Sequence, residues 1–362
     1  MQFIGVMSGT SCDGVDVALV EINGDIKVTQ ALHTCYPDAL KNKLLQLIQN
    51  QPVPTADVCQ LDVELARCYA DAIDKLLQTA GLSPQDITAV GLHGQTIWHH
   101  PSQALANTWQ LGSAAATAAY SGITTVANFR QLDMAHGGQG APLAPALHRE
   151  LFLSANQTVA VINLGGIANI TWLSEDSVIG YDVGPASCLM DGWVMRHQSQ
   201  PYDDQGQWAA SGQVVEPLLA ELLQEPFLHL PGPKSTGREL FNLQWLDEHL
   251  AGTNYLPEDI QRTLLQFTVA CIKLGFKQVG QTVDQVVVCG GGTHNRQLML
   301  TLAEALEVPC QSSAAFGVDP DFVEATLMAW MAERHMADQR LDLRSITGAD
   351  KPLLYGVRYE PA

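Results

Sequence analysis

The first twenty-two residues constrain the fold most, because they combine two apolar strands with a polar turn. Residues 3–7 and 15–22 have the apolar composition of buried strands, and residues 8–14, Ser-Gly-Thr-Ser-Cys-Asp-Gly, connect them. Gly9 and Gly14 can adopt positive φ and let a ligand approach the backbone. Consecutive N–H groups in such a turn form a concave nest that suits phosphate oxygens. The pattern predicts either a phosphate-binding turn or an ordinary β-hairpin.

The polar residues of this turn are also suited to a phosphate group and its cation. Thr10 and Ser11 carry hydroxyl donors, and Asp13 is a candidate ligand for a hydrated Mg²⁺. The turn matches neither of the two commonest nucleotide motifs. No Lys follows Gly14 as a P-loop requires, and a strand rather than a helix follows the glycines, unlike a dinucleotide-binding fold.

Length and charge limit the classes of partner. The chain has 362 residues, enough for two domains, and a net charge of 19 − 38 = −19. Nucleic acids and anionic membranes are bound through basic patches, so we expect neither as a partner. No apolar run is long enough for a membrane helix, and the N-terminus has no signal-peptide pattern. The eight cysteines contain no C-x-x-C pair, so we expect buried thiols in a reducing cytoplasm rather than a metal site.

The second half of the chain repeats the opening pattern. Residues 158–164 and 167–173 are predicted strands on either side of Gly165-Gly166. This repeat predicts a duplicated α/β fold, in which the two turns could hold one polyphosphate. We expect a first domain at 1–135, completed by 320–362, and a second at 136–320. The glycine-rich residues 136–143 are then a hinge or a plain linker.

Polar residues follow two predicted strands of the first half. The strand at 87–92 runs into His93-Gly-Gln95, and Arg130 follows a short strand at 124–127. Ligands in α/β folds bind at the carboxyl ends of strands, so His93 and Gln95 belong either to a site or to a surface loop.

A helix is predicted over 55–77, with Thr55 as its N-cap and Gly81 as its stop.

The second half contains a candidate general base and a loop with two cations. Asp182 ends a predicted strand at 178–182, just before a helix that we expect to begin at Pro185. It could act as a base or simply cap the helix. The loop at 231–239 carries Lys234 and Arg238, which suit an anionic ligand or solvent.

Two further features come late in the chain. Gly290-Gly291-Gly292 lies between a predicted strand at 283–288 and a predicted helix at 296–305, where a flat ligand could lie against the backbone. Glu324 stands among apolar residues of a predicted helix at 321–337, and it is paired, exposed or functional.

Together these motifs resemble the acetate/sugar kinase, heat-shock chaperone and actin superfamily and, more narrowly, the anhydro-N-acetylmuramic acid kinase family. The motifs that carry the resemblance span essentially the whole chain: GVMSGTSxDGVD at 5–16, LHGQT at 92–96, GGQGAPL at 137–143, NLGGIAN at 163–169, GYDxGP at 180–185, GPKSTGRE at 232–239 and VCGGG at 288–292. The resemblance implies two ribonuclease H-like domains with the active-site cleft between them.

The resemblance also implies ATP and Mg²⁺ and a set of residues that bind them. The nucleotide would be bound by three glycine-rich elements: Gly9, Thr10, Ser11, Cys12, Asp13, Gly14, Val15 and Asp16 in the first, Gly165 and Gly166 in the second, and Gly290, Gly291 and Gly292 in the third. Asp13 is the candidate for Mg²⁺.

The family is known for a coupled reaction on an amino sugar. Water opens the 1,6-anhydro ring of anhydro-N-acetylmuramic acid while ATP phosphorylates O6, during cell-wall recycling in the bacterial cytoplasm. The resemblance implies that Asp182 is the general base and that the protein is a homodimer. Our candidates for sugar binding are His93, Gln95, Arg130 and Glu324, with Arg130 for the lactyl carboxylate.

Two other functions remain compatible with the sequence. One is an ordinary sugar or acetate kinase, in which Asp182 deprotonates a substrate hydroxyl. The other is an ATP-binding switch without sugar chemistry, which would have a basal ATPase activity and a protein partner.

Overall fold

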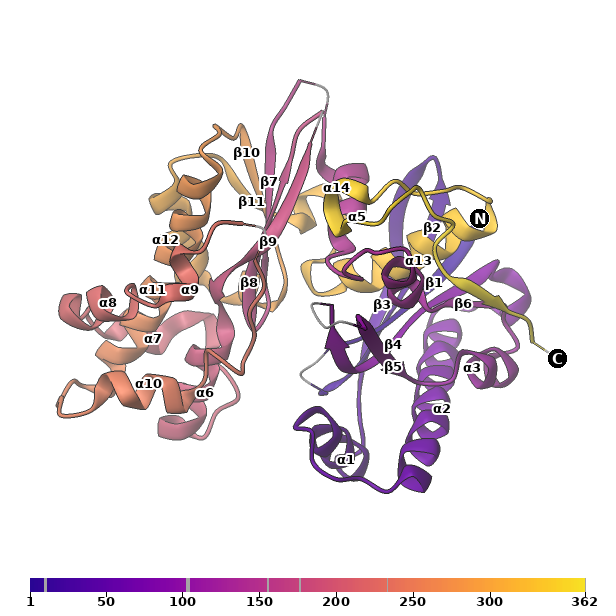
Figure 1. Cartoon of the computed structure of the whole chain (residues 1–362), viewed down its shortest axis with the longest axis horizontal. Coiled ribbons are helices and arrows are strands. Elements are labelled where there is room, and N and C mark those ends of the chain that lie inside the picture. The colour runs from indigo at the N-terminus through magenta and orange to yellow at the C-terminus, as the bar shows by residue number, and fades with distance from the viewer. Residues whose placement is uncertain (10–11, 102–104, 155, 176, 233, 362) are drawn as a thin grey trace. The chain divides into compact units, whose positions relative to one another are not determined.

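The chain folds into two compact units, which are described separately. The computed structural model describes all residues except 10–11, 102–104, 155, 176, 233 and 362 (Figure 1). One unit contains Met1–Leu147 and Phe322–Ala362, and the other contains His148–Asp321. The break between the units lies inside helix α5 (Ala144–Phe152), whereas the sequence analysis placed it at residue 135.

The glycine-rich segment 136–143 belongs to the first unit because a buried carboxylate holds it there. Asp133 is fully buried and accepts a hydrogen bond from the N–H of Gly140 at 2.7 Å. The same carboxylate accepts hydrogen bonds from Thr347 at 2.7 Å and Tyr355 at 2.6 Å, in the C-terminal segment. Asp133 therefore joins the glycine-rich segment to the end of the chain.

The sheet of the first unit has the strand order β12-β6-β4-β1-β2-β3, with β5 paired to β4. The strands β1, β2 and β3 are antiparallel, and β4 and β6 run parallel to β1. β1 is buried along nearly its whole length, as its apolar sequence predicts. The bounds of the strands are β1 (Gln2–Ser8), β2 (Gly14–Asn23), β3 (Asp25–Cys35), β4 (Ala89–His100), β5 (Asn107–Leu111), β6 (Thr125–Ala127) and β12 (Val357–Tyr359).

The five-stranded sheet of the second unit repeats the order and strand directions of β6-β4-β1-β2-β3 in the seven-stranded first sheet, without counterparts of β12 and β5. Its order is β11-β10-β7-β8-β9. The strands β7, β8 and β9 are antiparallel, and β10 and β11 run parallel to β7. The bounds are β7 (Val159–Leu164), β8 (Ile167–Leu173), β9 (Val178–Pro185), β10 (Gln285–Cys289) and β11 (Cys310–Ser312). The prediction of a duplicated, ribonuclease H-like α/β fold is confirmed.

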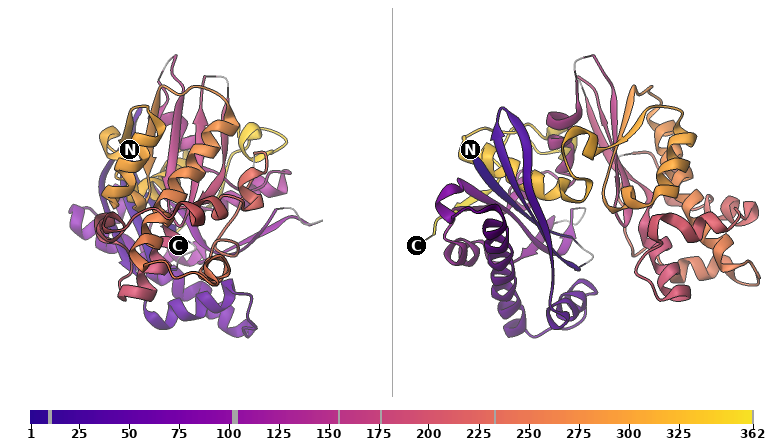
Figure 2. Two further views of the ribbon diagram at one scale, coloured as in Figure 1. Left: turned by 90° about the vertical axis from the view of Figure 1, so that its left-hand side faces the viewer. Right: turned by 180° about the vertical axis from the view of Figure 1, so that it is seen from behind.

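Helices cover both faces of the first sheet (Figure 2). Ile4 and Val6 of β1 share a hydrophobic core with helix α2 (Thr55–Ala80). A side chain at Gly5 would lie on the opposite face, where its Cβ would collide with the carbonyl oxygen of Ala325 in helix α13 (Val323–Met336). The alternation of side chains along a strand places these two helices on opposite faces. The remaining helices of this unit are α1 (Asp38–Ile48), α3 (Ala114–Ser121), α4 (Phe129–Ala135) and α14 (Arg344–Thr347).

Helix α11 (Pro257–Val279) is the centre of the helical layer in the second unit. It buries residues from Ile260 to Gly275 and packs against α6, α7, α8 and β9. Its neighbours are α6 (Ser187–Gln198), α7 (Gln207–Ser211), α8 (Glu216–Leu222), α9 (Pro226–His229), α10 (Leu243–Leu250) and α12 (Arg296–Leu306). Among the described residues of the whole chain, no helix is both long and apolar enough to cross a membrane.

Three predicted element boundaries are wrong. α2 follows Pro54 and has no side-chain cap, so Thr55 is not its N-cap, although Gly81 ends it with φ of 69° as predicted. β4 continues through His93 and Gln95 to His100, because pairing with β5 extends it. β9 continues past Asp182 to Pro185, and α6 begins only at Ser187.

Candidate functional site

Backbone and side-chain hydrogen bonds fix the described part of the β1–β2 turn. The carbonyl of Gly9 accepts from the N–H of Cys12 at 3.2 Å and from the side-chain amide of Gln95 at 2.9 Å. Gly14 must lack a side chain, because a Cβ there would collide with the carbonyl oxygen of Thr34. The predicted site residues Thr10 and Ser11 lie outside the described residues.

The other predicted residues of this turn divide into buried and accessible groups. The side chains of Cys12 and Val15 are fully buried in the core, so these residues can offer a ligand only their backbone. Asp13 is exposed, and Asp16 is partly exposed with its carboxylate 2.7 Å from Nδ1 of His33. Two carboxylates are typical of a Mg²⁺ site that is completed by water and phosphate oxygens. Across the described residues, no cluster of three or more His, Cys, Asp and Glu side chains forms an all-protein metal cage.

Buried His93 and half-buried Arg130 form an oriented pair in the first unit. Nδ1 of His93 lies 2.7 Å from the carbonyl of Gly94, which can only accept, so Nδ1 carries the proton. Nε2 then accepts from Nε of Arg130 at 2.8 Å. Burial, reinforced by the Arg130 charge, lowers the pKa of His93 to about 3, so the ring is neutral at pH 7. Both ring nitrogens are occupied, and His93 positions Arg130 rather than contacting a ligand through them.

The remaining sugar-binding candidates differ in accessibility. Gln95 is fully buried, and within the described structure its Oε1 has no hydrogen-bond partner. Arg130 is half-buried and also donates from Nη1 to the carbonyl of Gly140 at 3.4 Å. Glu324 is exposed, and its charge favours the charged form of Arg130 and so opposes the lowering of the Arg130 pKa by burial. The structure thus brings His93 and Arg130 into contact and places Glu324 close enough for its charge to interact with that of Arg130.

The carboxylate of Asp182 is held by two donors from the loop at 231–239. Its Oδ2 accepts from the hydroxyl of Ser235 at 3.1 Å and from the N–H of Thr236 at 3.0 Å. Burial raises the pKa of Asp182, and the nearby charge of Glu239 raises it further, while the two hydrogen bonds oppose the shift. Oδ1 accepts no hydrogen bond from any described residue, so it is the oxygen that can take a proton. Asp182 lies within β9 and does not cap α6.

The two cations of the loop at 231–239 have different roles. The Nζ of Lys234 donates to the carbonyls of Phe227 and Leu228 at 3.1 and 2.8 Å and lies 4.9 Å from the centre of the Phe227 ring. Lys234 therefore fixes the loop to α9. The guanidinium of Arg238 lies against Gly166 instead, in the turn between β7 and β8.

The β7–β8 turn is bound to the start of α6 through its carbonyl groups. The carbonyl of Gly165 accepts from the N–H of Ser187, and that of Gly166 accepts from the N–H groups of Ala186 and Cys188, at 3.0–3.1 Å. The N–H groups of both glycines lack a backbone or side-chain acceptor within the described part of the chain. Unpaired N–H groups in a turn suit an anion.

Packing requires glycine at two of the three glycine positions after β10. A Cβ on Gly290 would collide with the side-chain oxygen of Asn163, and one on Gly292 would lie 2.5 Å from Cβ of Leu164. These two glycines allow the chain to pack against β7. A Cβ on Gly291 would meet no atom nearer than 3.9 Å, the Oδ1 of Asp321. Of the three glycines, only Gly291 therefore has open space where a side chain would lie. The assignment of all three to the nucleotide site remains a prediction, because a ligand would contact their backbone.

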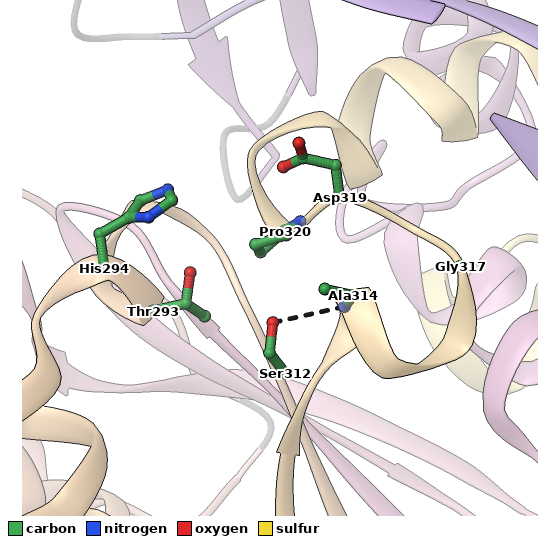
Figure 3. Close-up of a pocket in the computed structure, with 7 residues that line it drawn as sticks. All are labelled: Thr293, His294, Ser312, Ala314, Gly317, Asp319 and Pro320. Atoms are coloured by element: carbon green, nitrogen blue, oxygen red, sulfur yellow. Dashed lines mark hydrogen bonds between the residues drawn. The ribbon is translucent and has the colours of Figure 1, made fainter. Parts of the chain in front are cut away.

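A pocket of about 510 Å³ lies beside this turn, entirely within the second unit (Figure 3). Thr293 and His294 stand on one side, and the segment that follows β11 forms the other. The lining residues are Thr293, His294, Ser312, Ala314, Gly317, Asp319 and Pro320. His294 is oriented by Asp321, at 2.7 Å from Nε2. Sequence reasoning missed the residues after β11, since this segment carries no motif and lies close to the Gly290–Gly292 turn only in the folded chain.

The comparisons with known proteins agree with this arrangement. The family model described as anhydro-N-acetylmuramic acid kinase matches residues 1–361. Anhydro-N-acetylmuramic acid kinase of Pasteurella multocida is 44% identical, covering 99% of this chain and 97% of the relative, and that of Vibrio parahaemolyticus is 46% identical, covering 99% and 98%. Among solved structures, the 2-hydroxyisocaproyl-CoA dehydratase activator of Clostridium difficile with bound ADPNP is 13% identical with a TM-score of 0.47, covering 94% of this chain and 99% of that one, a likeness too low to add weight. The family model and the relatives cover the whole length of the chain, which therefore belongs to the anhydro-N-acetylmuramic acid kinase family of phosphotransferases.

Proposed function

We propose that this kinase opens the ring of 1,6-anhydro-N-acetylmuramic acid with water and transfers the γ-phosphoryl group of ATP to O6. The products are N-acetylmuramic acid 6-phosphate and ADP. The observation that carries the proposal is the geometry of Asp182, with Oδ2 held by two donors and Oδ1 open. The reaction needs one oriented carboxylate that accepts a proton from water.

The proposed step conserves atoms and charge. Oδ1 of Asp182 takes a proton from water, whose oxygen attacks C1 of the sugar. The C1–O6 bond breaks, and the electron pair released on O6 attacks the γ-phosphorus, with ADP as the leaving group. Asp182 later gives its proton to solvent. A raised pKa strengthens the carboxylate of Asp182 as a base.

The second unit supports the proposed binding of ATP. The pocket beside the Gly290–Gly292 turn is lined by the small or apolar residues Ala314, Gly317 and Pro320 together with the hydroxyl groups of Ser312 and Thr293, a combination that suits a nucleoside. Asp13 and Asp16 are the residues that would hold Mg²⁺. When bound, that ion neutralises charge on the phosphate oxygens.

The first unit supports the proposed binding of the lactyl carboxylate. Arg130 is half-buried, and His93 and Gly140 hold the orientation of its guanidinium. A guanidinium in fixed orientation pairs well with a carboxylate. We assign Arg130 this role, and His93 acts on the sugar only through Arg130.

The test is the product formed in ¹⁸O-labelled water with MgATP and the anhydro sugar. We expect a sugar 6-phosphate with one heavy oxygen at C1, measured by mass spectrometry. An unlabelled phospho-sugar would refute ring opening by water. Asp182→Asn should lose about 10³-fold or more in turnover, because the amide cannot take the proton, while ATP binding measured by calorimetry stays within about twofold.

A further inference from the structure

The guanidinium of Arg238 lies at the β7–β8 turn without a counter-ion. A Cβ on Gly166 would be 3.0 Å from Nη2 and 3.2 Å from Nε of Arg238, so the side chain lies directly against the turn. Among the residues that the structure describes, no carboxylate lies within 4 Å of this guanidinium and no group accepts a hydrogen bond from it. Arg238 therefore forms no direct ion pair with any described residue in a chain with a net charge of −19, although the more distant Asp191 interacts with its charge.

Backbone donors that are unpaired within the described structure lie in the same turn that the Arg238 guanidinium contacts. The N–H groups of Gly165 and Gly166 have no acceptor among the described residues, whereas both carbonyls of the turn are taken by the start of α6. Charged residues of this loop interact electrostatically with two nearby acids, Asp191 and Asp182, without forming ion pairs with them. The charge of Arg238 lowers the pKa of Asp191, although burial raises it overall to about 6, and Glu239 acts on Asp182. A guanidinium beside unpaired N–H groups is an arrangement that binds an oxyanion.

One short loop positions both this cation and the general base. Lys234 fixes the loop to the carbonyls of Phe227 and Leu228. Ser235 and Thr236 hold Oδ2 of Asp182, and Arg238 follows two residues later. The loop that holds the carboxylate of Asp182 therefore also carries Arg238.

We propose that Arg238 binds the oxygens of the γ-phosphoryl group during its transfer to O6. This inference rests on the proposed function, and it adds a residue to the phosphate-binding machinery of the second unit. The planar guanidinium can donate to two phosphoryl oxygens at once, which a point charge cannot. Its charge stabilises the negative charge spread over those oxygens in the transition state.

The test compares Arg238→Gln and Arg238→Lys with Arg196→Gln, an arginine in the same unit that pairs with Asp247 on the surface. Calorimetry with MgAMPPNP and MgADP measures binding, and initial rates give kcat and the KM of each substrate. We expect Arg238→Gln to lower kcat by about 10²-fold and AMPPNP affinity by about tenfold, with ADP affinity changed by less than about twofold. Arg238→Lys should recover part of the binding and less of kcat, and Arg196→Gln should behave as the wild type.

Wild-type kcat and AMPPNP affinity in Arg238→Gln would overturn the inference, as would a loss confined to the KM of the sugar. Thermal unfolding identifies a variant that fails to fold, and Arg238→Lys then decides the outcome by the same criteria. Failure of the proposed function has a different signature. The wild type would form no ¹⁸O-labelled product, while Arg238→Gln would still lose AMPPNP affinity selectively.

Discussion

The backbone nitrogen of Thr236 lies 3.0 Å from Oδ2 of Asp182 and donates a hydrogen bond to it, beside a second donor from Ser235 at 3.1 Å. Both bonds stabilise the charged carboxylate and oppose the rise in its pKa that burial causes. The backbone donor cannot be removed by a simple substitution, but the hydroxyl can. The pair therefore offers a direct way to vary the basicity of Asp182.

Ser235→Ala should move the acid limb of the pH–rate profile toward higher pH. Loss of the hydroxyl donor removes one interaction that lowers the pKa of Asp182, so the carboxylate becomes protonated, and inactive as a base, at a higher pH. The profile of kcat/KM for the sugar measures this shift. Ser211→Ala, which removes a hydroxyl bonded to the carbonyl of Trp208, is the control and should leave the profile unchanged. A shift toward lower pH would contradict the assigned role of the hydroxyl.

Asp133→Ala should destabilise the first unit strongly. The fully buried carboxylate accepts hydrogen bonds from Gly140, Thr347 and Tyr355, and truncation leaves all three donors without it. We expect the free energy of unfolding to fall by about 3 kcal/mol or more, measured by urea denaturation. Asp342→Ala, which removes an exposed carboxylate paired with Arg344, is the control and should cost about 1 kcal/mol or less. Equal effects of the two substitutions would contradict this account.

Much of this architecture follows from local patterns in the sequence. The strand–glycine–strand repeat at β1–β2 and β7–β8 predicts the duplicated sheet, because apolar runs and glycine turns are properties of neighbouring residues. The role of Asp133 could not be predicted, since Thr347 and Tyr355 lie more than two hundred positions away in the chain. The hydrogen bond between His93 and Arg130 could not be predicted either, because the two residues are distant in the chain. The two candidates were identified, but the contact that makes His93 a positioning group depends on how β4 and α4 pack.

His148→Gln should reduce the acid sensitivity of stability. The ring of His148 is buried beside Thr171, and burial lowers its pKa to about 3 from an ordinary value of 6.5. Below pH 6.5 the unfolded chain binds a proton that the folded chain does not, so stability is full above pH 6.5 and is lost as pH falls toward 3. At pH 5 this residue alone costs about 2 kcal/mol relative to pH 7.

Urea denaturation of the wild type and His148→Gln at pH 7 and pH 5 measures this contribution. The difference in unfolding free energy between the two pH values should be about 2 kcal/mol smaller in the variant. His229→Gln, at an exposed histidine, is the control and should leave the difference unchanged. If the difference in unfolding free energy between pH 7 and pH 5 were the same in His148→Gln as in the wild type, the imidazole would bind a proton equally well in the folded and the unfolded chain.

Gly291→Ala and Gly292→Ala should separate nucleotide binding from folding. A Cβ on Gly291 finds no atom within 3.9 Å, so Gly291→Ala should leave the unfolding temperature within about 1 °C of the wild type. Gly291 lies two residues before Thr293, which lines the pocket, and if the nucleotide binds against this turn we expect the added methyl group to weaken MgAMPPNP binding by about tenfold. A Cβ on Gly292 would press on Leu164 of β7 at 2.5 Å, so Gly292→Ala should lower the unfolding temperature by several degrees, about 2 °C or more. Calorimetry and thermal unfolding of both variants give the comparison, and a Gly291→Ala protein with unchanged AMPPNP affinity would exclude this surface as the site of the nucleotide.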